Sequence, residues 1–267
     1  MFTKITRVAA MVSCALATSA VFAAYPEKPV AIVVPFAAGG PTDVVARSLA
    51  QAMSTHIKGT VLVENVGGAG GTIGAGKVAR APGDGYTLLF HHIGMATAPT
   101  LYRKLDYKPL EDFIPIGAVV DVPMTLIGKP QTTQTNLKEL LAHIRVNKDK
   151  INLANAGVGS ASHLCGLLLQ NALKADLTTV PFSGTAPAIT ALLGGNVDIL
   201  CDQTTNTTGQ IRGGKVKAFA VTSKGKLANF PDLPTVATEV PGFEVGIWHV
   251  LYAPKNTPTD VVSKLQS

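Results

Sequence analysis

Residues suited to holding an anion recur in loops that follow apolar, strand-like segments of the sequence. Of six such loops, four are rich in glycine, serine or threonine and run into a segment with helical spacing. The first turn of a helix presents unpaired backbone N–H groups and the positive end of its dipole, and hydroxyl side chains add donors. The pattern therefore indicates recognition of a small anion. The loops are residues 36–43, 67–72, 91–95, 155–163, 182–185 and 202–207.

The same polar residues have an ordinary structural explanation. Thr42, Asp43, Ser160 and Ser162 stand where helices are expected to begin, and any helix accepts such residues as N-caps. Capping is a sufficient explanation for a single loop. It does not call for so much glycine in several loops, so we favour a binding site shared by two separate parts of the chain.

Motifs for catalysis are absent from the sequence or incomplete. It contains no G-x-S-x-G nucleophile elbow and no phosphate-binding G-x-x-x-x-G-K-[ST] segment. His91 and His92 are adjacent in a predicted strand, where successive side chains point to opposite faces, so their spacing does not suit a metal site. His163 lies near Ser160 and Ser162 without a nearby carboxylate, which favours a histidine at a helix start. We expect no enzymatic activity, no metal and no cofactor.

The elements that position these loops alternate between strands and helices. This alternation indicates right-handed βαβ units, and hence an α/β fold of mainly parallel sheets flanked by helices. Ligands of such sheets bind beyond the C-terminal ends of the strands, where the six loops lie. The pattern restarts near residue 125, so we expect two units side by side. Strands are predicted over residues 30–36, 61–66, 86–90, 114–120, 124–128, 151–155, 178–181, 197–201 and 216–222, and helices over 44–57, 137–146, 162–173 and 186–193, with another ending at 78.

The first residues have the pattern of a secretory signal peptide. Lys4 and Arg7 precede an apolar stretch over residues 8–16, and small residues then precede a cut after Ala23. We therefore expect residues 1–23 to be removed and the protein to be periplasmic. After this segment no apolar run reaches the roughly 18 residues needed to span a bilayer.

The composition excludes several other classes of protein. Apolar residues make up 46% of the 267 residues and are spread along the chain, which argues against intrinsic disorder. The net charge of +6 is modest, and the lysines near residues 215–226 have no interleaved aromatic residues. We expect no nucleic-acid binding, because a basic patch of that kind is missing. A diffuse positive field would instead attract small anions.

Two cysteines remain after the expected signal peptide, Cys165 and Cys201. An oxidising compartment permits a disulfide between them. Two buried thiols that pack as small apolar side chains are an equally acceptable alternative. The sequence leaves this choice open.

Several segments together resemble one known family. They are PFAAGGPTDVVAR at residues 35–47, ENVGGAGG at 64–71, PGDGYTL at 82–88, GVGSASHL at 157–164, GGNVD at 194–198 and FPDLPT at 230–235. The family is that of the TctC-like, or Bug-type, solute-binding proteins, which serve tripartite tricarboxylate transporters. The resemblance implies a two-lobed periplasmic binding protein fold of type II that closes on a small carboxylate.

The resemblance also implies an organisation into lobes. Lobe 1 would span residues 24–125 and lobe 2 residues 126–247. Residues 248–267 would form a crossover strand and the start of a return to lobe 1. Family members usually continue beyond this point, so we expect the return to be truncated.

By the same resemblance, residues 36–43, which include Phe36 and Asp43, form the first-lobe half of a carboxylate clamp. The N–H groups near Gly39 and Gly40 and the hydroxyl of Thr42 would donate to the ligand, some of them through water. The second-lobe half would come from Ser160, Ser162 and the helix start at His163, with Gly184 and Thr185 closing over the ligand.

The remaining expected contacts lie around this clamp. His92 and Trp248 would be walls, and Phe36 and Phe182 would face an aromatic ring of the ligand or else pack in the core. Asp202 would repel a second carboxylate or pair with an amine or hydroxyl. The residues expected at the far end of the ligand are Asp202, Gln203, Thr204 and Thr205.

These features predict a carrier that binds a dicarboxylate or aromatic acid and delivers it to the membrane permease subunits of a tripartite tricarboxylate transporter. We expect a monomer that recognises its ligand through uncharged donors, because Arg47 is the one basic residue near these loops and lies one turn into its helix. Two alternatives remain, a sensory co-receptor with the same site and a secreted enzyme on the same fold.

Overall fold

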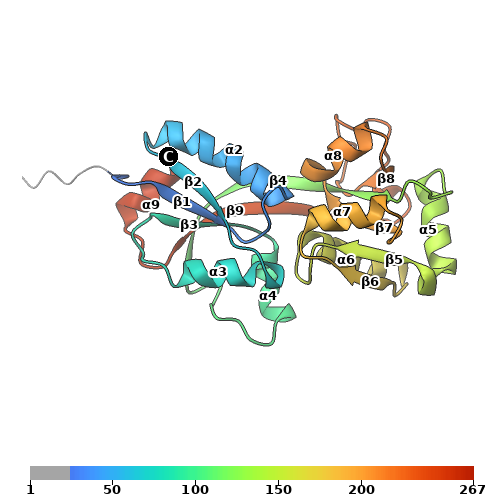
Figure 1. Ribbon diagram of the computed structural model, residues 1–267, viewed down its shortest axis with the longest axis horizontal. Helices are drawn as coiled ribbons and strands as arrows, with labels where there is room; N and C mark the ends of the chain where they lie inside the picture. The colour runs from blue at the N-terminus through green and yellow to red at the C-terminus, as the bar shows by residue number, and fades with distance from the viewer. Residues whose placement is uncertain (1–24) are drawn as a thin grey trace, which may run out of the picture.

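The computed structural model describes residues 25–267, which fold into two lobes lying side by side (Figure 1). The predicted signal peptide, with its cut after Ala23, lies outside these residues. Strands fill the middle of each lobe and helices cover them. Within the described range, no helix has both the length and the apolar character needed to cross a membrane.

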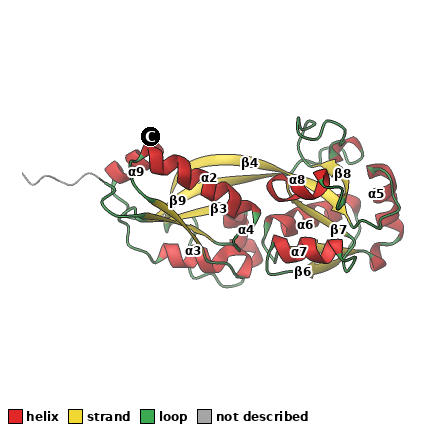
Figure 2. Ribbon diagram, turned by 45° about the horizontal axis from the view of Figure 1, so that its top comes forward, coloured by secondary structure: helices red, strands yellow, loops and turns green. Residues whose placement is uncertain are grey.

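The first lobe is built on three strands, with β1 between β2 and β3 and parallel to both. Helices α2 and α3 lie on opposite sides of these strands (Figure 2). Ile32, Leu88 and Phe90 are fully buried in the core beneath α2. The elements are β1 (Val30–Val34), α2 (Pro41–His56), β2 (Val61–Asn65), the 3-10 helix η1 (Ala69–Gly71), α3 (Thr72–Ala79), β3 (Thr87–His92) and α4 (Gly94–Leu101).

The second lobe repeats this plan, with β5 parallel to both β6 and β7. Its core includes Leu140, Ile144 and Leu153, which come from the first helix and first strand of the lobe. The elements are α5 (Leu137–Val146), η2 (Lys148–Lys150), β5 (Asn152–Asn155), α6 (Ala161–Leu173), β6 (Thr178–Pro181), α7 (Thr185–Leu193), β7 (Ile199–Gln203), α8 (Thr204–Arg212), β8 (Lys217–Val221) and η3 (Val236–Thr238).

Two antiparallel strands run between the lobes, β4 (Phe113–Gly128) and β9 (Gly246–Pro254). β4 pairs with β9 as far as Pro123, and from Met124 onward it pairs with β7. The predicted strands 114–120 and 124–128 are therefore one strand, and the predicted lobe boundary at residue 125 lies inside it. The full strand order is β2-β1-β3-β9-β4-β7-β5-β6, with β8 also paired to β4.

The last helix, α9 (Thr259–Gln266), packs on the first lobe. Val262 and Leu265 contact its core, and the side-chain amide of Gln266 donates to the carbonyl of Ile116 at 3.1 Å. The segment after β9 thus returns to the lobe in which the chain began.

The sequence pattern did not predict helices α4 and α8. α4 contains Pro99 and has no regular apolar spacing, whereas α8 is rich in threonine and asparagine, which are weak helix formers. The tertiary structure holds α8 in place, because the hydroxyl of Thr125 in β4 donates to that of Thr207 at 2.7 Å.

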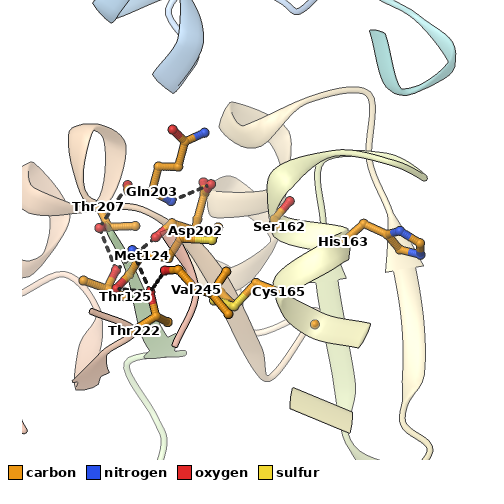
Figure 3. The surroundings of a disulfide bond; sticks show 12 residues. Met124, Thr125, Ser162, His163, Cys165, Asp202, Gln203, Thr207, Thr222 and Val245 are labelled. Atoms are coloured by element: carbon orange, nitrogen blue, oxygen red, sulfur yellow. Dashed lines mark hydrogen bonds between the residues drawn. A yellow bond between two sulfur atoms is a disulfide. The ribbon is translucent and has the colours of Figure 1, made fainter. Parts of the chain in front are cut away.

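Cys165 and Cys201 form a disulfide, which joins α6 to β7 (Figure 3). The sequence left open whether these cysteines form a disulfide or remain two buried thiols, and the structure has the disulfide. Both cysteines are buried. Ser162 lies one turn before Cys165, and Asp202 directly follows Cys201, so the bond ties together two segments that carry predicted site residues.

Candidate functional site

A small cavity of about 30 Å³ lies between the two lobes. This space admits a few water molecules but is smaller than an organic acid, so we expect a larger ligand to require the lobes to move apart. Of the described residues that line the cavity, none is a lysine or an arginine. The lining residues are Phe36, Ala37, Ala38, Gly40, Pro41, Thr42, His92, Ala156, Ser160, Ala161, Ser162, Gly184, Thr185, Ala186, Asp202 and Gln203.

Four helices begin at this cavity. The starts of α2, α6 and α7 line it directly, and Asp202 and Gln203 end β7 just before α8. The N–H groups of a first helical turn have no partner within the helix, and the dipole end is positive. An anion placed here is therefore stabilised from both lobes without a basic side chain.

Two serine hydroxyls at the start of α6 form a pair. The Oγ atoms of Ser160 and Ser162 are 3.1 Å apart, and both side chains are buried. The Oγ of Ser160 also accepts from the N–H of His163 at 3.2 Å, as an N-cap does, and that of Ser162 accepts from the N–H of Ala156 at 2.8 Å. The bond between the hydroxyls uses one of their two hydrogens, so the other is available to a ligand.

Thr42 reaches the crossover strand β9. Its Oγ1 lies 3.2 Å from Nε2 of His249, and both side chains are buried. Nδ1 of His249 lies 2.9 Å from the carbonyl oxygen of Ile247, and a carbonyl only accepts. Nδ1 therefore carries the ring hydrogen, and burial lowers the pKa of His249 to about 4, which keeps the ring neutral at pH 7. Nε2 then accepts the hydroxyl hydrogen of Thr42.

Asp202 places a buried carboxyl group at the cavity. One oxygen accepts from the N–H of Gln203 at 2.8 Å, and the other lies 3.4 Å from the side-chain nitrogen of Asn206, which is a long hydrogen bond. Burial raises the pKa of Asp202 to about 6, against the lowering effect of these bonds and of one to Thr185. In Figure 3 the side chains of Ser162, Asp202 and Gln203 extend to the same side of the disulfide.

Phe36 and His92 line the first-lobe side of the cavity, and His91 packs against both. The ring of Phe36 stacks on that of His92, with centroids 4.6 Å apart, and meets His91 edge-on. Burial lowers the pKa of His91 to about 3 and that of His92 well below its ordinary value, so both rings are neutral at pH 7. Their proximity does not make a metal site: no cluster of three or more potential metal ligands occurs in the described part of the chain.

Comparison with known proteins decides the family. Residues 45–267 match the family described as the tripartite tricarboxylate transporter family receptor, TctC. The chain belongs to this family. The resemblance inferred from the segments of the sequence is thereby confirmed, and the TctC receptors are solute-binding proteins.

Solved structures confirm the two-lobed α/β prediction. The periplasmic binding protein BugD is 59% identical, with a TM-score of 0.87 over 90% of this chain and 81% of BugD. MatC from Rhodopseudomonas palustris, solved with bound malate, is 43% identical, with a TM-score of 0.85 over 90% of this chain and 83% of MatC. Rpa4515 from R. palustris, solved with adipate, is 32% identical, with a TM-score of 0.87 over 90% of this chain and 81% of that protein.

Within this TctC receptor, ten of the seventeen residues expected at the ligand line the cavity. They come from both lobes, as a clamp between lobes requires. They are Phe36, Gly40, Thr42, His92, Ser160, Ser162, Gly184, Thr185 and, at the expected far end, Asp202 and Gln203.

Two residues of the expected first-lobe clamp brace the loop instead of facing the cavity. The carboxylate of Asp43 accepts from the N–H of Gly39 at 2.8 Å, from Arg47 at 2.9 Å and from Asn65 at 2.9 Å. Burial opposes ionisation of Asp43, but these bonds outweigh it and lower its pKa. The N–H of Gly39 is thus occupied, and Arg47 is paired away from the cavity.

The expected donor groups of Gly40 and Thr42 are also occupied. The N–H of Gly40 lies 3.3 Å from the carbonyl of Ala37, and the Thr42 hydroxyl donates to His249. Both residues still line the cavity. In this structure the hydroxyl hydrogen of Thr42 is thus directed to His249, and donation from Thr42 to a ligand stays a prediction.

Five further expected residues lie outside the cavity lining. The side chain of His163 points away from Ser162 (Figure 3), and its Nδ1 accepts from the N–H of Gly159 at 3.2 Å. Thr204 and Thr205 belong to α8, where Thr205 is exposed. Trp248 is partly exposed on β9. Phe182 lines a neighbouring groove.

The neighbouring groove, which we call the mouth groove, has a volume of about 530 Å³. It shares Phe36, Ala37, Ala156 and Gly184 with the cavity, and its other walls include the loop 67–71, Tyr102, Val158 and Phe182. The mouth groove therefore leads from the cavity to the surface between the lobes. Tyr102 and His249 are contributors that the sequence did not suggest, since no motif surrounds either of them.

Proposed function

We propose that this chain is a periplasmic carrier that encloses a small organic carboxylate between its lobes and delivers it to the membrane subunits of a tripartite tricarboxylate transporter. The carboxylate lies at the four helix starts, held by the N–H groups of α6 and α7 and by the free hydroxyl hydrogen of the Ser160–Ser162 pair. The protein acts as a monomer, exported by its signal peptide, and it catalyses no reaction.

The convergence of four helix starts on one cavity without a basic side chain is the observation that carries this proposal. Each charge-assisted hydrogen bond contributes about 1.5–3 kcal/mol, and each helix end adds roughly 0.3–1 kcal/mol. A few such contacts, less the cost of immobilising the ligand, correspond to a dissociation constant of about 1 μM or below. MatC with malate and Rpa4515 with adipate support a dicarboxylate as ligand.

Closure of the lobes links binding to delivery. Among residues 25–267, only β4 and β9 run between the lobes as strands, so a change of angle there opens or closes the mouth groove. A ligand that contacts α2 from one side and α6 from the other favours the closed form. The membrane subunits can then distinguish loaded from empty carrier by its shape.

Isothermal titration calorimetry on the purified mature protein tests the binding step. Malate, succinate, adipate and benzoate are titrated separately, and at least one dicarboxylate should bind with a dissociation constant of about 1 μM or below. Mass spectrometry of acid released from protein purified without added ligand should identify the same class. Absence of binding by every acid, with a folded protein, would contradict the proposal.

A pair of serine variants locates the ligand. Ser162→Ala removes a hydroxyl at the cavity and should weaken binding by about tenfold, because the loss of one hydrogen bond to a charged group costs roughly 1.5 kcal/mol. Ser223→Ala removes a partly exposed hydroxyl in a loop that does not line the cavity and should leave binding unchanged. Equal affinities for both variants would place the carboxylate elsewhere.

A further inference from the structure

The groups that line the cavity differ in what they can offer a ligand. The hydroxyl of Thr42 donates its hydrogen in a bond to His249, so toward the cavity its oxygen can only accept a hydrogen bond. This assignment follows from the carbonyl of Ile247, which leaves His249 a single arrangement of its ring hydrogen. Thr42 is therefore an acceptor toward the cavity.

Asp202 is a second acceptor. When ionised it has no hydrogen to give, and its three hydrogen bonds, to the N–H of Gln203 at 2.8 Å, to Asn206 at a long 3.4 Å and to the side chain of Thr185, leave acceptor capacity unused. The side chain is 1% exposed, so bulk water does not reach it when the lobes are closed. A buried carboxylate with spare acceptor capacity is stabilised by a ligand that brings a donor.

Gln203 adds a third acceptor next to Asp202. Its side chain is 2% exposed, and its Oε1 atom has no hydrogen-bond partner among the residues that the structure describes. A buried amide oxygen without a partner is costly. The cost is removed when a ligand donates to it.

Other groups at the cavity are hydrogen-bond donors. The Ser160–Ser162 pair has one free hydrogen, and the first turns of α6 and α7 present N–H groups. These donors suit a carboxylate, whereas the acceptors Thr42, Asp202 and Gln203 do not. A simple dicarboxylate such as succinate has no hydrogen for them.

We propose that this cavity selects acids that carry a hydrogen-bond donor, a hydroxyl or an ammonium group, beside a carboxylate, and that His249 is the positioning residue that keeps Thr42 an acceptor. The proposal rests on the carboxylate-binding function proposed above and narrows it to hydroxy or amino dicarboxylates. The carboxylate faces the helix starts and the serine pair, and the donor faces Thr42 and Asp202.

Calorimetry with three four-carbon acids tests the selection. Succinate has no donor, malate has a hydroxyl and aspartate has an ammonium group in the same position. The dissociation constant of malate or of aspartate should be at least about tenfold lower than that of succinate, because succinate leaves buried acceptors unpaired. Whichever of malate and aspartate binds more tightly shows whether the site prefers a hydroxyl or an ammonium group.

The outcomes separate this inference from the function on which it rests. Succinate binding as tightly as both other acids would overturn the selection while the carrier function stands. Failure of all three acids, and of adipate and benzoate, would overturn both.

Variants of Thr42 and His249 test the positioning role through the ratio of affinities. Thr42→Val removes the acceptor and should bring the affinity for the preferred acid close to that for succinate, whereas Thr42→Ser keeps the oxygen and should retain the preference. His249→Phe frees the Thr42 hydrogen to point into the cavity, so the preference should fall although Thr42 is intact. A purely structural role of His249 would weaken both acids equally and leave the ratio unchanged, which would overturn the positioning role.

Thr55→Val is the matched control for these variants. Thr55 is exposed near the C-terminal end of α2 and does not line the cavity, so this variant should keep the wild-type ratio. Thermal unfolding of each variant verifies that it is folded before titration. If His249→Phe does not fold, the comparison of Thr42→Val with Thr42→Ser decides the question: an equal ratio in the two overturns the proposal.

Discussion

The hydroxyl of Tyr102, at the end of α4 in the first lobe, donates a hydrogen bond of 2.7 Å to the carbonyl oxygen of Val158 in the second lobe. Both residues line the mouth groove. The bond therefore breaks whenever the lobes separate to admit or release a ligand, and it contributes to the stability of the closed form.

Replacement of Tyr102 by phenylalanine removes this bond and keeps the ring. Stopped-flow measurements should show that the ligand dissociates about two- to tenfold faster, since one hydrogen bond contributes roughly 0.5–1.5 kcal/mol. The midpoint of thermal unfolding should change little. Tyr86→Phe is the control, because Tyr86 accepts from the N–H of Glu27 on the opposite side of the lobe. Identical dissociation rates for wild type and Tyr102→Phe would show that the bond does not hold the lobes closed.

Gly70 of the first lobe lies tightly against Val158 of the second lobe, beside this bond. It has a φ of +61°, and a Cβ atom at this position would lie 2.0 Å from the carbonyl oxygen of Val158. Gly70→Ala should therefore keep the lobes from closing fully and weaken ligand binding by about tenfold or more. Small-angle X-ray scattering should show that the ligand no longer compacts the variant.

Gly242→Ala provides a matched control for backbone strain. Gly242 has a similar φ of +79°, but nothing lies within 4 Å of the added Cβ atom. This variant should lose about 1 kcal/mol of folding stability, as Gly70→Ala does, without a change in affinity. A comparable loss of affinity in both variants would attribute the effect to strain instead of to contact between the lobes.

Asp202→Asn should stabilise the ligand-free protein at neutral pH. Burial raises the pKa of Asp202 from 3.8 to about 6, so the folded protein binds the proton more tightly than the unfolded chain does. Above about pH 6 the ionised carboxyl group therefore lowers the free energy of unfolding by its full amount. This effect decreases as the pH falls and is lost near pH 4. Urea unfolding at pH 7 should show a gain of about 2–3 kcal/mol for the variant, which vanishes near pH 4.

Asp232→Asn is the reference for this experiment, because Asp232 is exposed. It should change the free energy of unfolding by less than about 0.5 kcal/mol at either pH. The comparison also cancels the effect of the buried histidines, whose lowered pKa values destabilise all variants in acid. A gain for Asp202→Asn that is equal at pH 7 and pH 4 would contradict the raised pKa.

The disulfide should contribute strongly to folding stability. Cys165 and Cys201 are separated by 36 residues, and a cross-link over such a loop stabilises by about 3–4 kcal/mol through the unfolded chain. The double variant Cys165→Ala/Cys201→Ala should lose this amount in urea unfolding. Dithiothreitol should lower the midpoint of the wild type to that of the double variant and leave the variant unaffected. A wild type insensitive to full reduction would show that the bond contributes little.

Much of the fold was predictable because its local signals agree. The β-branched run at residues 30–34, with Pro41 after it, indicates a buried strand and then a helix start, and the structure has both. Asn136 and Glu139 are the N-cap and third residue of α5, whose predicted bounds match the structure. Helix α8 has no such signals. It is held by a tertiary contact of Thr207 with β4, which the local sequence does not indicate.

The candidate site was predictable residue by residue only where a loop both starts a helix and faces the other lobe. Ser160 and Ser162 satisfy both conditions. Asp43 and His163 stand in equally suggestive loops, yet their side chains turn back to brace those loops. The partner of Thr42 is 207 residues away in the sequence, so only the three-dimensional structure shows which way its hydrogen points.

The position of β9 in the sheet has a consequence for the order of assembly. It is the ninth strand along the chain, but it lies between β3 and β4 and bonds to both. During synthesis, when the N-terminal part emerges first, the edge of β3 has no partner strand until the whole second lobe has followed. We therefore expect the first lobe to be completed last, when the segment 246–254 pairs with β3 and β4.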